Sequence, residues 1–111
     1  MHYPVVFISN NFTKDSFNNT PFEILFLKEA AIIDNYELIF NNQNISFDYL
    51  ITDSSEYLKK MNIEFDGDCA ITNYFLQTSV ENVFAIGNAN SSKKNITDQF
   101  EIIIEYIINP E

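Results

Sequence analysis

The sequence predicts an α/β domain in which a β-meander precedes a strand-turn-helix unit. Three features indicate this: short apolar runs alternate with turn residues in the first half, a compact apolar run ends at Gly87, and the last segment has apolar residues at helical spacing. A chain of 111 residues can bury a core but is too short for two domains, so we expect a single domain over residues 1–111.

The first half of the chain is expected to consist mainly of strands. A polar stretch after the first apolar run is typical of a loop, and Asp34-Asn35 is typical of a tight hairpin because both residues tolerate positive φ. We therefore expect a β-meander over residues from about 20 to 52. The runs that carry this prediction are residues 5–8, 22–27, 30–33, 36–40 and 46–52.

The second half changes character. Ser54 or Ser55 is expected to cap a short helix, and Asp66-Gly67 is expected to form a turn before a short strand at residues 69–72. Residues 83–86 are a compact apolar run closed by a glycine, which indicates a buried strand that ends at a tight turn.

The last element is predicted to be an amphipathic helix. Its apolar residues recur at helical spacing and form one stripe. Asn95 with Asp98 resembles a capping box at its start, and Asn109-Pro110 ends it. The stripe consists of Ile96, Phe100, Ile103, Ile104, Ile107 and Ile108.

Composition excludes several classes of function. Sixteen carboxylates against six lysines, with no arginine, give a net charge of −10, which excludes nucleic-acid binding and disfavours adhesion to anionic membranes. No apolar run approaches the roughly 18–20 residues of a membrane span, and the first residues lack the features of a signal peptide. A single cysteine, Cys69, excludes an internal disulfide and a cysteine-rich zinc site, and with a single histidine, His2, most metal-ligand sets are excluded as well. We therefore expect a cytoplasmic protein without a metal or catalytic residue.

Residues 78–89 are the most informative stretch for chemistry. They predict a loop, a buried strand and a glycine turn, followed after a short linker by a helix N-terminus. In parallel sheets ligands bind at the carboxyl ends of strands, and helix N-termini favour anionic groups. Gly87 would allow close approach of a ligand, and Asn88 would present an amide to it. An ordinary strand-turn-helix connection explains the same spacing.

Residues 78–88, TSVENVFAIGN, resemble the FAD-contacting signature of thioredoxin reductase-like members of the pyridine nucleotide-disulfide oxidoreductase superfamily, Thr-Ser-Val-x-Gly-Val-Phe-Ala-x-Gly-Asp. Asn82 replaces the turn glycine, a mild change because Asn tolerates αL. Asn88 replaces the aspartate that binds the ribityl chain. The similarity covers residues 48–108 and implies a flavin-domain-like tail from about residue 53 to 111. It implies FAD contacts at Gly87, Asn88, Ala89, Asn95 and Ile96.

Other hallmarks of that family are missing. The chain has no Gly-x-Gly-x-x-Gly and no Cys-x-x-Cys, and Gln99, Phe100, Glu101 and Ile102 stand where small residues let the helix approach the flavin. We therefore expect a truncated flavoprotein segment that works, if at all, with a partner chain supplying the missing loops. A non-catalytic interaction module derived from a reductase is the alternative, and a product without selected activity is a third.

A segment separated from the rest of a reductase would leave apolar surface uncovered. Ile102 and Tyr106 lie off the main stripe of the last helix, so two of its faces have apolar surface to bury. We expect a homo-oligomer or a complex with another chain, with this helix at the interface. His2 is interpreted as incidental and Cys69 as a strand residue.

Overall fold

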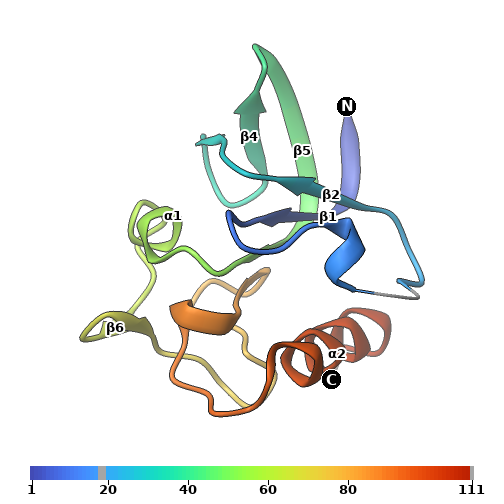
Figure 1. The fold of residues 1–111 in the computed structure, drawn as a ribbon. Coiled ribbons are helices and arrows are strands. Elements are labelled where there is room, and N and C mark those ends of the chain that lie inside the picture. The colour runs from blue at the N-terminus through green and yellow to red at the C-terminus, as the bar shows by residue number, and fades with distance from the viewer. Residues whose placement is uncertain (18–19, 111) are drawn as a thin grey trace.

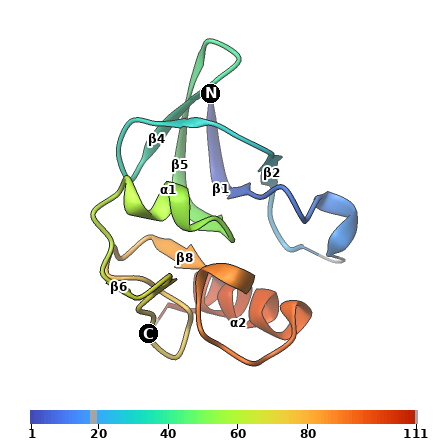
Figure 2. The same cartoon turned by 60° about the vertical axis from the view of Figure 1, so that its left-hand side comes forward.

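A six-stranded mixed sheet forms the centre of the molecule, and α1 and α2 lie well apart in both views of it (Figures 1 and 2). The computed structural model describes residues 1–17 and 20–110. The strands of the sheet are β1 (His2–Ile8), β2 (Ile24–Leu27), β3 (Ala31–Ile32), β4 (Glu37–Phe40), β5 (Gln43–Thr52) and β8 (Val83–Ala85). The remaining elements are the hairpin of β6 (Phe65–Asp66) and β7 (Cys69–Ala70), the helices α1 (Ser55–Lys59) and α2 (Ile96–Ile108), and 3₁₀ helices at Lys14–Ser16 and Gly87–Ala89.

The long strand β5 joins two kinds of pairing. Its first half pairs antiparallel with β4, which in turn pairs antiparallel with β3. Its second half lies between β1 and β8, both parallel to it, and β2 is parallel to β1 on the far side. At the carboxyl end of β5 the strand order is therefore β2-β1-β5-β8, and all four strands point the same way.

Strand alternation divides the core between the two faces of the sheet. Val5 and Phe7 on β1 face α2 and pack in one cluster with its Phe100 and Ile103. Val6 and Ile8, the alternate residues of β1, face the other way and pack in one cluster with Leu58 of α1. Each helix therefore buries its apolar side against a different face of the same sheet.

The connection from β1 to β2 is held against α2 by aromatic packing. Phe17, just after the first 3₁₀ helix, stacks on Phe100 with ring centroids 3.9 Å apart, and it also contacts Phe7 at 5.6 Å. In the usual β-α-β unit an α-helix makes this connection, whereas the described residues between β1 and β2 form only the 3₁₀ helix at Lys14–Ser16.

Several predicted elements are confirmed. The strands at β1 and β8, the short helix α1 and the long helix α2 all lie where the sequence predicts them. Asn95 is the N-cap of α2, and its Oδ1 accepts a hydrogen bond from the backbone N–H of Asp98 at 2.9 Å. In the part of the chain that the structure describes, no helix is long and apolar enough to cross a membrane.

The predicted meander is too long. The strand at residues 24–27 pairs parallel with β1 instead of continuing into β3, so the meander contains only β3, β4 and β5. Parallel pairing of β1 and β2 joins segments far apart in the chain, and the connection between them contacts α2 through Phe17 and Phe100. A local pattern of apolar runs does not carry this information.

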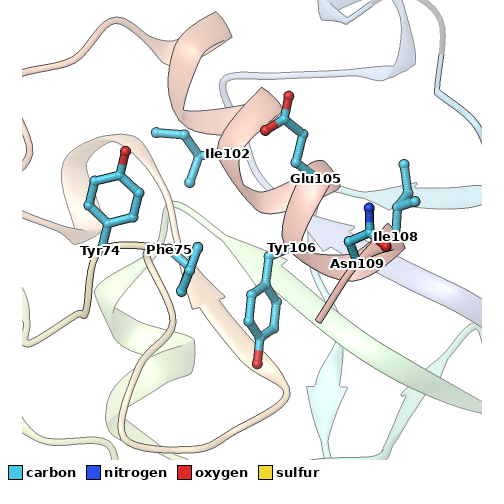
Figure 3. Close-up of a pocket in the computed structure, with 7 residues that line it drawn as sticks. All are labelled: Tyr74, Phe75, Ile102, Glu105, Tyr106, Ile108 and Asn109. Carbon is cyan, nitrogen blue, oxygen red and sulfur yellow. The ribbon is translucent and has the colours of Figure 1, made fainter. Parts of the chain in front are cut away.

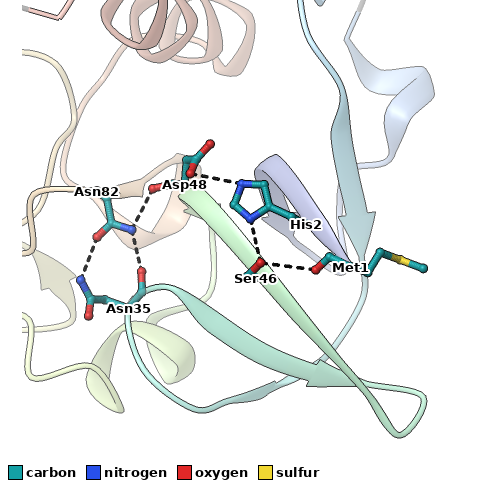
Figure 4. Close-up of polar contacts among 6 residues, drawn as sticks. All are labelled: Met1, His2, Asn35, Ser46, Asp48 and Asn82. Carbon is teal, nitrogen blue, oxygen red and sulfur yellow. Dashed lines mark hydrogen bonds and ion pairs between the residues drawn. The ribbon is translucent and has the colours of Figure 1, made fainter.

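The predicted hairpin at Asp34-Asn35 is confirmed, because β3 and β4 pair antiparallel on either side of it, but neither of these residues has positive φ. The positive φ values lie in the next turn, between β4 and β5, at Asn41 (52°) and Asn42 (60°). Asn82 does not adopt αL either. Its side-chain amide donates instead to the carbonyl oxygens of Asn35 at 2.6 Å and Asp48 at 3.0 Å, so it links the β3–β4 turn to β5 (Figure 4).

Candidate functional site

The parallel part of the sheet has a topological switch point between β1 and β5. The chain leaves β1 for β2 on one side, and it leaves β5 for β8 on the other. The carboxyl ends of β1 and β5, followed by Ser9 and Asp53, therefore lie side by side where the outgoing connections diverge. In open parallel sheets this is the place where ligands bind.

A crevice of about 360 Å³ lies at this position, and we call it the switch-point crevice. Residues from four parts of the chain meet there: the loop after β1, the end of β5, the 3₁₀ helix after β8, and the start of α2. Its lining residues are Asn11, Phe12, Asp53, Gly87, Asn88, Ser92, Lys94, Ile96 and Gln99.

The β1 side of the crevice is closed by hydrogen bonds around Asp53. Its Oδ2 accepts hydrogen bonds from Ser9 Oγ at 2.9 Å and from Asn11 Nδ2 at 3.0 Å. Asp53 is 8% exposed. Ser9 Oγ in turn accepts the backbone N–H groups of Asn11 and Phe12 at 2.9 and 3.0 Å. These contacts join the carboxyl ends of β1 and β5. They also occupy the backbone N–H groups of Asn11 and Phe12, which are therefore not free to bind a ligand.

The β8 side is closed by Gln99, which is 3% exposed. Its Oε1 accepts from the backbone N–H of Gly87 at 2.9 Å and from Asn90 Nδ2 at 3.0 Å. Its Nε2 donates to the carbonyl oxygen of Lys94 at 2.8 Å. One side chain thus joins the glycine turn to the start of α2.

Gly87 is favoured by its backbone conformation, because its φ is +61°. A Cβ at this position would lie 3.4 Å from Ile96 Cδ1 and 3.6 Å from Asp53 Cβ, which are ordinary van der Waals distances. The positive φ, and not a lack of space, therefore explains the glycine.

The structure brings together three of the five predicted contact residues. Gly87, Asn88 and Ile96 line the crevice. Ala89 is fully buried in the core on the α1 side of the sheet, and Asn95 is used as the helix cap.

Sequence reasoning did not predict the other six lining residues as contacts: Asn11, Phe12, Asp53, Ser92, Lys94 and Gln99. The first two follow the carboxyl end of β1, and their position after a predicted parallel strand was the available signal.

The residues of the crevice do not fit a dinucleotide in the arrangement that the chain adopts. Backbone N–H groups after the first strand bind the phosphates in such folds, but here those of Asn11 and Phe12 are bonded to Ser9. The Asp53 carboxylate would face the phosphates, and the N–H of Gly87 already has Gln99 as its acceptor. A ligand would have to displace these contacts.

A second polar group, unconnected with the crevice, involves His2. Its Nδ1 lies 2.7 Å from Ser46 Oγ and its Nε2 lies 3.2 Å from Asp48 Oδ1 (Figure 4). These are the residue types of a nucleophilic triad, which requires a buried carboxylate to orient the imidazole. Here the side chains of His2 and Asp48 are 53% and 60% exposed, so water competes for both contacts. The group fastens the first residues of β1 to β5.

Comparisons with protein-family models, curated proteins and solved structures find no match to this chain. The reductase resemblance therefore stays an expectation from the sequence. The fold itself defines a mixed α/β protein with a parallel switch point.

Proposed function

We propose that the chain is a non-catalytic protein-interaction module built on a sheet of the dinucleotide-binding type. The observation that carries this proposal is the closed switch-point crevice. Asp53 and Gln99 use the donors and acceptors at the strand ends for internal hydrogen bonds, so a small ligand finds few free groups there.

Exposed apolar side chains support the same proposal. Tyr74 is 76% exposed and Ile108 is 53% exposed, and both line a hollow between α2 and the chain before β8. Large apolar groups that gather beside one another at the surface mark contact sites for other molecules.

A second candidate is the FAD-contacting segment of a thioredoxin reductase-like flavoprotein, active only with a partner chain. One observation favours it: Gly87, Asn88 and Ile96 meet at the carboxyl edge of parallel strands, where a cofactor of that family would lie. In this candidate, Gln99 must release the N–H of Gly87 when the partner binds.

Co-expression with the flavin-binding half of a thioredoxin reductase, which carries Gly-x-Gly-x-x-Gly, separates the two functions. The interaction module predicts that the isolated chain and any complex purify without flavin absorbance. Stoichiometric FAD in the complex, released on heating, would refute the module and support the second candidate.

Titration of FAD into Asn88→Asp tests the site itself. A carboxylate accepts a stronger hydrogen bond than an amide, so a surviving flavin site should bind FAD about tenfold more tightly in this variant. Asn42→Asp adds the same charge at the distant β4–β5 turn and serves as the control. The interaction module predicts no FAD binding by either variant, and tighter binding by Asn88→Asp alone would contradict it.

A further inference from the structure

Two hollows on the surface adjoin across Tyr106 of α2. The first, about 420 Å³, lies between α2 and the chain before β8, and Tyr74, Phe75 and Ile102 line it (Figure 3). The second, about 470 Å³, continues past Tyr106 to Tyr49 and the β3–β4 turn. We call the two hollows together the aromatic groove.

The wall of the groove is held in place by aromatic contacts. The Tyr106 ring lies 4.9 Å from that of Phe75 and 5.7 Å, edge to face, from that of the buried Phe84. Its hydroxyl accepts a hydrogen bond from Gln77 Nε2 at 3.3 Å. A ligand would therefore meet a formed surface and would lose little free energy in ordering it.

The charged residues that line the groove are all acidic, and the imidazole of His2, outside the lining, lies 3.2 Å from Asp48 Oδ1. Asp48, Glu81 and Glu105 line it, and no lysine is among the lining residues of either hollow. The last turn of α2 also has no basic residue, so the partial negative charge of the helix C-terminus is not compensated there. Burial is the largest cause that raises the pKa of the Tyr49 phenol, and the charges of Tyr106, Asp48 and Glu81 act in the same direction.

We propose that the aromatic groove docks a basic segment of another polypeptide, with an apolar side chain between Tyr74 and Ile102 and arginine or lysine side chains against Glu105 and Glu81. Tyrosine faces and carboxylates both attract cations, and the guanidinium group of arginine suits both. A second copy of this chain fits the groove poorly, because each copy carries a net charge of −10. This inference rests on the proposed function and names its partner.

Fluorescence anisotropy with three labelled peptides tests the chemistry of the partner. The first is an amphipathic leucine–arginine peptide, the second has glutamate in place of arginine, and the third is oligoarginine without leucine. We expect saturable binding of the first, no binding of the second, and about tenfold weaker binding of the third. Equal binding of the acidic peptide, or no saturable binding of the first, would overturn the proposal.

Charge reversal at the groove tests the location. Glu105→Lys places a cation in the last turn of α2, where it favours the helix, so a loss of binding would not reflect unfolding. We expect about five- to tenfold weaker binding of the leucine–arginine peptide, and a similar loss in Tyr74→Ala. Glu29→Lys makes the same charge change at an exposed loop residue, next to Ala30 whose backbone N–H donates to the Tyr57 hydroxyl of α1, and should change the affinity by less than about twofold.

The remaining outcomes separate this inference from the proposed function. Equal weakening by Glu105→Lys and Glu29→Lys would show general charge attraction and refute the groove. A stable homodimer in ultracentrifugation that Tyr74→Ala dissociates would refute the basic partner. Neither result contradicts the interaction module if the co-expressed complex contains no flavin. FAD in that complex refutes the interaction module, regardless of how the peptides bind.

Discussion

Replacement of Gln99 by leucine tests how the switch-point crevice is closed. Leucine has nearly the same volume but removes the acceptor for the Gly87 N–H and Asn90 Nδ2 and the donor to the Lys94 carbonyl. A buried group left without its partner costs about 1–3 kcal/mol. Asn90 is 5% exposed and Gly87 is half-buried, so their N–H groups would be left without an acceptor. Lys94 is exposed, so water can donate to its carbonyl oxygen in place of Gln99. The cost should therefore be about 2–4 kcal/mol.

Urea unfolding and a thermal melt measure this loss. For a domain of this size, it corresponds to a fall in Tm of roughly 8–20 °C. Gln43→Leu, at an exposed residue beside the β4–β5 turn, is the control and should change stability by less than about 0.5 kcal/mol. If Gln99→Leu loses no more than this control, water satisfies the orphaned donors and Gln99 does not close the crevice.

Three further predictions concern single positions. Gly87→Ala should destabilise by about 1–2 kcal/mol in urea unfolding, and by about as much as Gly67→Ala, because both glycines have positive φ and the added Cβ meets only ordinary contacts or open space. Unchanged stability in both variants would contradict the left-handed backbone conformation. Asn95→Ala should cost about 1 kcal/mol through the lost cap of α2, and unchanged urea stability would show that the cap contributes nothing.

The third prediction concerns Tyr49. Burial raises the pKa of its phenol above the ordinary value of 10.0. Its contribution to stability is therefore complete below pH 10 and is lost as the pH rises through the pKa of the folded state. Tyr49→Phe should lessen the fall in urea stability between pH 9 and 11, and an identical pH profile would contradict this.

Local patterns predicted the elements well where one face is buried. The helical spacing of Ile96, Phe100 and Ile103 predicts α2, and the residues before Gly87 predict β8. In each case the spacing of the apolar residues shows which side of the element is buried. The polar run after β1 did not reveal that Phe17 would stack on Phe100, or that β2 would lie parallel to β1. Such pairing is a long-range choice that no window of neighbouring residues contains.

The candidate site shows the same division. Residues around Gly87 were identifiable because a glycine after a buried strand indicates a tight turn and a close approach. Asn82 was misinterpreted because its backbone could adopt αL, whereas the tertiary structure uses its amide to reach Asn35 and Asp48. Side-chain amides bond to whatever the fold brings within reach, so their roles follow from packing.

The sequence by itself determined the charge, the absence of phosphate-binding glycine motifs, and the two amphipathic or buried elements that frame the C-terminal half. Only the tertiary structure decided that the carboxyl ends of β1, β5 and β8 converge and that Asp53 and Gln99 fill the space between them. It also decided that the acidic side chains of β5, the turn before β8 and α2 gather around Tyr106. The physical reason is that hydrophobic periodicity reports whether a residue is buried, whereas strand order decides which distant residues become its neighbours.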